Sequence, residues 1–270
     1  MSMTLSPLGE LLRQWRGARG MSQLDLALAA GVSSRHVSFV ETGRSQPSRP
    51  MTLRLAETLD LSLRERNELL LAAGFAPMFQ ERGVDDAALE PVRRALELVL
   101  ETHEPYPAFV LDRAGNVLLS NGGFRKLLRL MLPAGSSAGS PVNVVRLCLD
   151  PDLLRSRLRN WEVVAHVLGH RVSRQLRSES DPRVRELFEE LLAFPAVREA
   201  MEQIDAPAEY EVVIPMEFEM DGTRLSWFST IATIGTPRDI TLEDLRIESL
   251  FPADEGTEQT VRALLDAARR

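Results

Sequence analysis

Serine and arginine side chains that could contact DNA gather between residues 33 and 49. On a helix that starts near Ser33 and turns by about 100 degrees per residue, polar residues share one face, while Val37 and Val40 share another. Arginine can donate two hydrogen bonds to a guanine edge, and a serine hydroxyl can contact a base or a phosphate. We expect this face to enter the major groove of duplex DNA through Ser33, Ser34, Arg35 and Ser38.

The residues that follow this helix suggest weaker, sequence-independent contacts. Arg44 and Arg49 lie in the next loop, where contact with phosphate is favoured over contact with bases. His36 falls on neither face cleanly, and phosphate contact and simple exposure are equally compatible with its position. Glu41 would repel DNA, so we expect it to accept a hydrogen bond within the helical domain instead.

Helical spacing of apolar residues over positions 8–75 predicts five short helices and no strand. Ser22 and Ser33 stand where helices should begin, and Gly31 and Gly43 where helices should end. One predicted apolar group consists of Leu24, Leu26, Ala27 and Ala30. We assign residues 1–76 to this all-α domain.

The stretch from Ser22 to Leu59 closely resembles the Xre or lambda-repressor type of helix-turn-helix domain. The resemblance rests on Ser22-Gln23-Leu24-Asp25-Leu26-Ala27, Ala30-Gly31-Val32-Ser33, Val37 to Arg44, Pro47, and Leu53, Leu55, Ala56 and Leu59. It implies that the second helix braces across the DNA backbone and that the third reads the groove. It also implies that Gln23 contacts a phosphate and braces the helices.

Length and charge indicate a second, different domain. A chain of 270 residues is too long for one small helical domain. Seven arginines against five acids give residues 1–60 a charge of +2, so the rest of the chain carries −9 and the total is −7. The basic part therefore coincides with the predicted DNA-binding domain. We expect a linker at 77–88 and a second domain at 89–270.

The second domain shows the order of a PAS-like fold. A helix over 89–102 precedes two strands, 106–112 and 116–121, joined by Arg113-Ala114-Gly115. A helix near 124–131 follows, then helices over 152–201 interrupted before Pro182 and Pro195. Three consecutive strands come next. In the first, from Val212 to Met220, apolar and polar residues alternate. The turn Asp221-Gly222 leads to the second, over 223–236, and the third covers 245–251. A last helix starts near Thr257. The predicted fold class is α+β, with a five-stranded antiparallel sheet and covering helices.

Several short sequence segments in this domain resemble those of the MmyB-like transcription regulators, whose PAS-like domain is associated with fatty-acid-type ligands. They lie at 106–113, 143–147, 150–151, 160–162, 228–230 and 247–254. The resemblance implies a cavity for a small apolar molecule.

The residues themselves support a cavity independently but less specifically. The alternating strand has one apolar face rich in methionine, which suits an adaptable pocket, although core packing explains the same pattern. A carboxylate ligand would need a donor such as arginine. The predicted ligand contacts are Arg146, Arg155, Arg157, Asn160, Trp161, Met216 and Phe218. Surface ion pairing remains the alternative for each of these arginines.

Signals for an enzyme were sought and none is complete. His166 and His170 are one helical turn apart, yet no glutamate directly follows His166 and no third metal ligand is evident. Gly122-Gly123 is interpreted as a turn rather than a nucleotide-binding loop. Cys148, the single cysteine, is expected to be a small buried apolar residue. We expect no catalytic residue, metal or cofactor.

These observations predict a cytoplasmic, sequence-specific transcription regulator controlled by a fatty-acid-like molecule. It would bind double-stranded DNA as a homodimer, without inserting into a membrane, because no apolar run reaches the roughly 20 residues that span a bilayer. The alternative is a DNA-binding regulator whose second domain serves only dimerisation or partner binding, as in an antitoxin.

Overall fold

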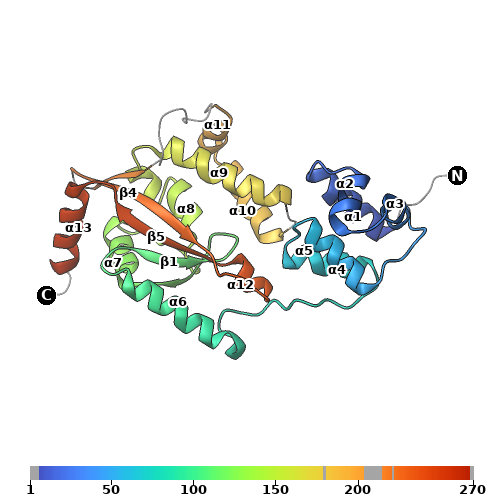
Figure 1. Cartoon of the computed structure of the whole chain (residues 1–270). Helices are drawn as coiled ribbons and strands as arrows, with labels where there is room; N and C mark the ends of the chain where they lie inside the picture. Colours follow the sequence, from blue (N-terminus) through green and yellow to red (C-terminus); the bar gives the residue numbers. More distant parts are fainter. Residues whose placement is uncertain (1–5, 179–180, 204–214, 221, 268–270) are drawn as a thin grey trace. The chain divides into compact units, whose positions relative to one another are not determined.

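The computed structural model describes residues 6–178, 181–203, 215–220 and 222–267 (Figure 1). The chain forms two compact units. The first joins Met1–Arg82 to a later segment, Thr236–Glu243, and the second comprises Gly83–Gly235 and Asp244–Arg270. The fold is α+β, as predicted.

The first unit contains the five predicted helices, and each begins at a serine. The side chains of Ser6, Ser22, Ser33, Ser48 and Ser62 each accept a hydrogen bond from the backbone N–H three residues later. Such capping satisfies a backbone donor that the helix itself leaves unpaired. The helices are α1 (Pro7–Ala18), α2 (Gln23–Ala30), α3 (Ser34–Glu41), α4 (Arg49–Thr58) and α5 (Leu63–Ala72).

The core of the first unit requires a close approach of α1 to the end of α3. A Cβ atom on Gly9 would lie 2.1 Å from the carbonyl oxygen of Glu41, so only glycine fits there. Between α2 and α3, Gly31 adopts a left-handed φ of 66° that closes α2 tightly. Leu26, Ala27 and Ala30 are buried as predicted, but Leu24 is 56 % exposed, so its assignment to the apolar face was wrong. Its position on α2 turns it away from the core.

The second unit is built on one antiparallel sheet with the strand order β2-β1-β5-β4-β3. The strands are β1 (Ala108–Leu111), β2 (Val117–Ser120), β3 (Met216–Met220), β4 (Thr223–Ala232) and β5 (Arg246–Pro252). This is the predicted five-stranded sheet. Strand β4 ends before the predicted position 236, because the chain leaves the sheet and forms α12 (Ile240–Asp244) before β5. Val212, Ile214 and Asp221 lie outside the described residues.

Helices of the second unit precede, connect and follow the strands. They are η1 (Ala87–Leu89), α6 (Glu90–Thr102), α7 (Gly122–Met131), α8 (Val144–Leu149), η2 (Leu154–Arg157), α9 (Trp161–Ser178), α10 (Pro182–Leu192), α11 (Pro195–Gln203) and α13 (Glu255–Ala267). As predicted, Pro182 and Pro195 open new helices. The core joins the inner face of the sheet to α7, α8, η2 and the start of α9.

The interpretation of Gly122-Gly123 as a turn was wrong, because both residues belong to the first turn of α7. The side chain of Asn121 caps this helix, and the Glu104 carboxylate accepts hydrogen bonds from the backbone N–H groups of both glycines. Gly123 is required by packing, since a Cβ atom there would lie 2.3 Å from the carbonyl oxygen of Pro105.

Candidate functional site

Helix α3 presents the predicted reading face to solvent. Ser33, Ser34 and Arg35 are exposed at its first turn, whereas Val37 and Val40 are 0 % exposed. The division of α3 into a polar and an apolar face is therefore confirmed. Ser38 is half-buried, and the Ser33 hydroxyl accepts the backbone N–H of His36 at 3.1 Å. Ser33 thus orients the first turn of the helix.

Phe39 brings two of the predicted DNA-contacting arginines together. The guanidinium carbon of Arg35 lies 5.0 Å from the centre of the Phe39 ring, and that of Arg44 lies 5.9 Å from it. Both distances fall within the range of cation–π attraction. Phe39 was not among the predicted site residues. An aromatic residue four positions after Arg35 on a helix was the available signal.

A buried carboxylate, Glu41, ties α1, α2 and α3 together. Its oxygens accept hydrogen bonds from Arg16 at 2.6 Å and from the Gln23 amide at 2.7 Å, and Arg13 lies 3.6 Å away. Burial alone would raise the pKa of Glu41, but the hydrogen bonds from Arg16 and Gln23 and the arginine charges hold it below its ordinary value. The expected hydrogen bond of Glu41 within the helical domain is therefore confirmed. Gln23 braces α2 against α3, while its phosphate contact stays a prediction.

Arg44 and Arg49 are exposed on either side of the loop between α3 and α4. Arg49 is the first residue of α4. The start of a helix carries partial positive charge from its unpaired N–H groups. Arg49 adds a full positive charge there, which suits contact with a phosphate.

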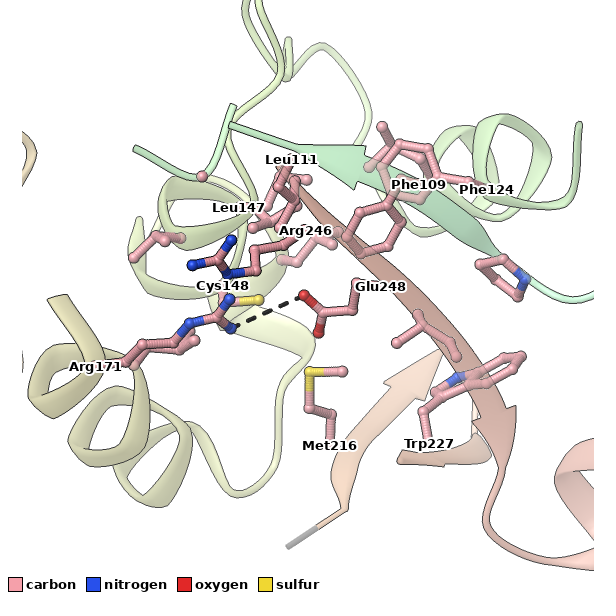
Figure 2. A pocket seen from close by; sticks show the side chains of 18 of the residues that line it. Phe109, Leu111, Phe124, Leu147, Cys148, Arg171, Met216, Trp227, Arg246 and Glu248 are labelled. Atoms are coloured by element: carbon pink, nitrogen blue, oxygen red, sulfur yellow. Dashed lines mark ion pairs between the residues drawn. The ribbon is translucent and has the colours of Figure 1, made fainter. Parts of the chain in front are cut away.

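The second unit encloses an apolar cavity of about 120 Å³ between the sheet and helices α7, α8 and α9 (Figure 2). Its apolar walls include Phe109 and Leu111 of β1, Phe124 and Met131 of α7, and Trp227 of β4. Met216 and Phe218 of β3 line it as well. The face of β3 that the sequence pattern singled out therefore faces the cavity.

Charged residues line one part of the cavity. Glu248 of β5 is almost completely buried, and an Arg171 nitrogen from α9 lies 4.0 Å from its carboxylate (Figure 2). Burial raises the pKa of Glu248, while the charge of Arg171 and a hydrogen bond with Ser229 act in the opposite direction. Arg246 also lines the cavity from β5. Arg113 and Asp112 line the cavity too, so three arginines and two carboxylates contribute to its lining.

Cys148 also contributes to the wall of the cavity. The residue is partly exposed, but burial of its thiol, together with the charge of Glu248, raises the pKa of Cys148 to about 12. The thiol is therefore protonated at neutral pH, where it acts as a small, weakly polar wall group rather than a nucleophile.

Five of the predicted ligand contacts lie outside the cavity lining. The Arg146 guanidinium pairs with Glu190 at 2.5 Å, and that of Arg155 lies 3.9 Å from the Trp161 ring. The Asn160 amide donates to the carbonyl of Pro215 at 2.7 Å. Arg146, Arg155, Arg157, Asn160 and Trp161 are all absent from the lining residues. The arginines that line the cavity are instead Arg113, Arg171 and Arg246.

The sequence carries a signal for part of this charged wall, although Arg246 and Glu248 were not among the predicted contacts. Residues two apart on a strand share a face, so Arg246, Glu248 and Leu250 of β5 point the same way. A glutamate is seldom buried in a strand unless it is paired. Arg171, by contrast, comes from α9 and meets Glu248 only through the tertiary fold.

Two histidines of α9 lie side by side. The rings of His166 and His170 lie 4.3 Å apart and are tilted against each other. In the part of the chain that the structure describes, no cluster of three or more histidine, cysteine, aspartate or glutamate side chains could hold a metal ion. The helices described there are all too short or too polar to cross a bilayer.

An exposed reading helix in one unit and an apolar cavity in the other define the class of this protein. It is a DNA-binding transcription regulator with a ligand-binding-type domain.

Comparison with known proteins gives the family. Residues 92–264 match the MmyB-like transcription regulator ligand binding domain, and residues 7–69 match a helix-turn-helix domain. The first match covers more than half of the chain, which therefore belongs to the MmyB-like transcription regulators. The chain is also 30% identical, over 118 residues, to the uncharacterized HTH-type transcriptional regulator RghRB of Bacillus subtilis (strain 168). That alignment covers 43% of this chain and 76% of the relative.

Proposed function

We propose that a fatty-acid-like molecule, bound in the cavity of the second unit, controls the DNA binding of this regulator. The observation that carries the proposal is the combination of apolar walls with arginines, Arg171 and Arg246 among them, in the lining of the same cavity. An apolar core that served packing alone would gain nothing from charged groups, because burying a charge is costly unless it is paired.

The charged wall suits a carboxylate head group. Arg113, Arg171 and Arg246 bring positive charge to the cavity lining, and Asp112 and Glu248 bring carboxylates. Arginine can hold a ligand carboxylate through two parallel hydrogen bonds. The head group is therefore proposed to bind Arg171 and Arg246.

The apolar walls suit a hydrocarbon chain. Each buried methylene contributes about 0.8 kcal/mol, so affinity should rise steadily with chain length until the cavity is filled. Phe124, Met131 and Met216 are among the apolar residues that line the cavity. Methionine adapts to chains of different shape because it is unbranched and flexible.

At the DNA, we propose sequence-specific contacts from α3 by two copies of the chain. Ser33, Ser34, Arg35 and Ser38 would contact bases and adjoining phosphates, while Gln23, Arg44 and Arg49 would contact phosphates. One such helix reads only a few base pairs, which favours a homodimer on a near-palindromic site.

The ligand proposal is tested by thermal denaturation of the full chain with saturated fatty acids of increasing length. Stabilisation should grow with chain length and should fall in Arg171→Gln and Arg246→Gln. The matched control is Arg146→Gln, which removes an arginine paired with Glu190 outside the cavity. If no chain stabilises the protein, the second unit serves dimerisation or partner binding instead.

A further inference from the structure

Trp227 is a buried donor that lines the cavity without a partner. Its side chain is 0 % exposed, and its Nε1–H has no hydrogen-bond partner among the described residues. In Figure 2 the indole nitrogen faces the cavity. Buried donors in proteins are almost always paired, so an unpaired one in a cavity wall points to a ligand acceptor.

The sheet register separates this donor from the charged wall. Trp227 is the partner of Pro252 on β5, whereas Glu248 is the partner of Ile231. The two positions are therefore four residue steps apart along the strand, about 13 Å at roughly 3.3 Å per residue. A carboxylate held at Arg246 would not reach Trp227 as well.

We propose that the natural ligand is an acyl carboxylate with a second oxygen, a hydroxyl or an oxo group, partway along its chain. This inference rests on the proposed function and deepens it. The second oxygen would accept the Trp227 N–H, while the carboxylate binds the arginines. An unsubstituted chain would leave the buried donor unpaired, which lowers its affinity.

The experiment compares dodecanoate with dodecanoates hydroxylated at successive positions, by calorimetry on the full chain. At least one hydroxylated chain should bind about twofold to tenfold more tightly than dodecanoate, the effect of one neutral hydrogen bond. In Trp227→Phe that preference should disappear while dodecanoate still binds. Trp161→Phe, a tryptophan outside the cavity lining, should keep the preference.

Two results overturn the inference, and they differ in meaning. Binding of dodecanoate without preference for any hydroxylated chain would refute the second acceptor and leave the proposed function intact. Binding of no chain at all would refute both. Thermal unfolding of Trp227→Phe without ligand establishes that the variant is folded.

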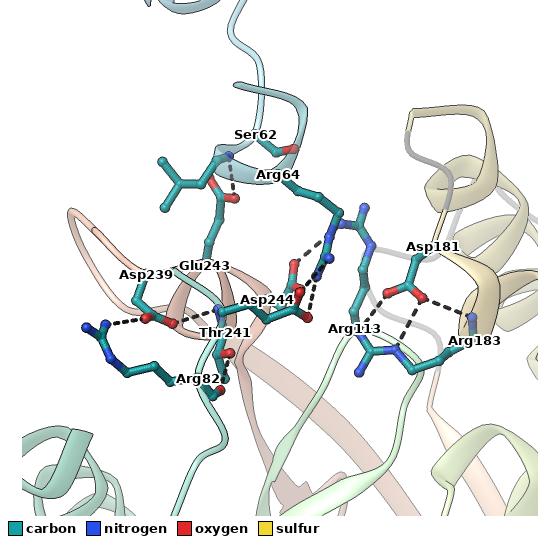
Figure 3. Close-up of polar contacts among 12 residues, drawn as sticks. Ser62, Arg64, Arg82, Arg113, Asp181, Arg183, Asp239, Thr241, Glu243 and Asp244 are labelled. Carbon is teal, nitrogen blue, oxygen red and sulfur yellow. Dashed lines mark hydrogen bonds and ion pairs between the residues drawn. The ribbon is translucent and has the colours of Figure 1, made fainter. Parts of the chain in front are cut away.

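A separate observation concerns the segment Thr236–Glu243, which belongs to the same compact unit as the DNA-binding helices (Figure 3). The backbone N–H of Ile240 donates to the carbonyl of Gln80 at 2.8 Å, and Arg82 pairs with buried Asp239 at 2.7 Å. The Thr241 hydroxyl donates to the carbonyl of Arg82 at 2.5 Å. Backbone and side-chain contacts thus fix this segment to residues 80–82.

The same segment also caps a helix of the DNA-binding unit. The Glu243 carboxylate accepts the backbone N–H of Leu63, the first residue of α5, at 2.8 Å (Figure 3). A negative charge is favourable at a helix start because the unpaired N–H groups there carry partial positive charge. Helix α5 carries Leu69 of the apolar core, so Glu243 acts on an element that holds the unit together.

Strand β5 starts only a few residues after Glu243 and carries Arg246 and Glu248 of the cavity wall. It is hydrogen-bonded to β1 on one side and to β4 on the other, so it is a stiff element. We infer that β5 and the segment before it couple occupancy of the cavity to the DNA-binding unit. This inference rests on the proposed function but not on the identity of the ligand.

The first test uses operator DNA selected with the full-length protein. In the wild type, saturating dodecanoate should change operator affinity about fivefold or more, the usual range of allosteric coupling. In the double variant Asp239→Asn, Glu243→Gln that change should fall below about twofold, with dodecanoate binding retained. Glu219→Gln, which breaks a surface ion pair with Arg159, is the control. Full coupling in the double variant would overturn the inference.

The second test needs no ligand. Amide hydrogen exchange is measured in peptides that contain Leu63 and Ile240. The test variant, Leu250→Ala, alters β5 at the cavity. The control variant, Leu187→Ala, opens a space in α10 of the same unit. Both amides should exchange faster in Leu250→Ala than in Leu187→Ala. Equal exchange in the two variants would overturn the inference even if no fatty acid binds.

Discussion

At the residue scale, two buried glutamates, Glu41 and Glu248, show how neighbouring groups determine whether a buried carboxylate is stable in its ionised form. Hydrogen bonds and arginines lower the pKa of Glu41, whereas burial raises the pKa of Glu248. Glu41 therefore stabilises the fold as an ion. In the cavity wall, burial disfavours the ionised form of Glu248.

Replacement of Glu41 by glutamine should destabilise the helical unit at neutral pH, on the order of 3 kcal/mol, because it leaves the arginines without a buried counter-charge. The pKa of Glu41 is lowered on folding, so its contribution is present above the ordinary glutamate pKa of about 4.3 and is lost as pH falls through the folded value. The difference between wild type and Glu41→Gln should therefore shrink in acid.

The measurement is urea unfolding followed through Trp15, in a background where Trp161 and Trp227 are replaced by phenylalanine. Trp15 belongs to the core of the first unit and reports on it alone. Exposed Glu10 on α1 supplies the control, since Glu10→Gln should have little effect at any pH. A difference that is constant with pH would contradict the role assigned to the Glu41 charge.

Arg35 and Arg44 should differ in what they contribute to DNA binding, although both lie beside Phe39. Arg35→Ala should weaken operator binding by about 1 to 3 kcal/mol and leave binding to random DNA almost unchanged. Arg44→Ala should weaken binding to all duplexes alike and flatten the salt dependence, because a lost phosphate contact releases fewer counterions. Titrations with operator and random duplexes at several salt concentrations separate the two roles, and identical behaviour of the variants would refute them.

At the element scale, two glycines of α1 should respond in opposite directions to the same substitution. Gly9→Ala should destabilise the unit by about 1 to 3 kcal/mol or more, because the added Cβ meets the backbone of Glu41. A Cβ atom on Gly17 would meet nothing within 4 Å, so Gly17→Ala should stabilise the helix by about 0.5 to 1 kcal/mol. Unfolding followed through Trp15 measures both changes, and equal losses would mean that helix propensity, not close packing, governs α1.

Elements were predictable from the sequence where the relevant interactions are local. Serine caps and helical spacing located α2 and α3, and alternation located β3, because neighbouring residues determine these features. The partners of Arg146 and Glu248 are not local. Arg146 pairs with Glu190, and Glu248 lies beside Arg171, so only the tertiary fold separates a surface arginine from a cavity arginine.

At the scale of the whole molecule, the negative charge of the second half should keep that half away from DNA while the basic first half binds. We predict a homodimer with half-sites about one helical turn apart on the operator. Light scattering of the free protein and of the complex with operator DNA checks the stoichiometry. A strict monomer in both would contradict it, and footprints over a single half-site would do so independently.

The division of the DNA-binding unit between two distant stretches of chain has a consequence for biosynthesis. The ribosome completes α5 long before it makes Glu243, whose carboxylate caps that helix. The unit can therefore reach its final set of contacts only after most of the second half has been synthesised. A nascent chain that stops short of this point carries a reading helix without the segment that finishes its support.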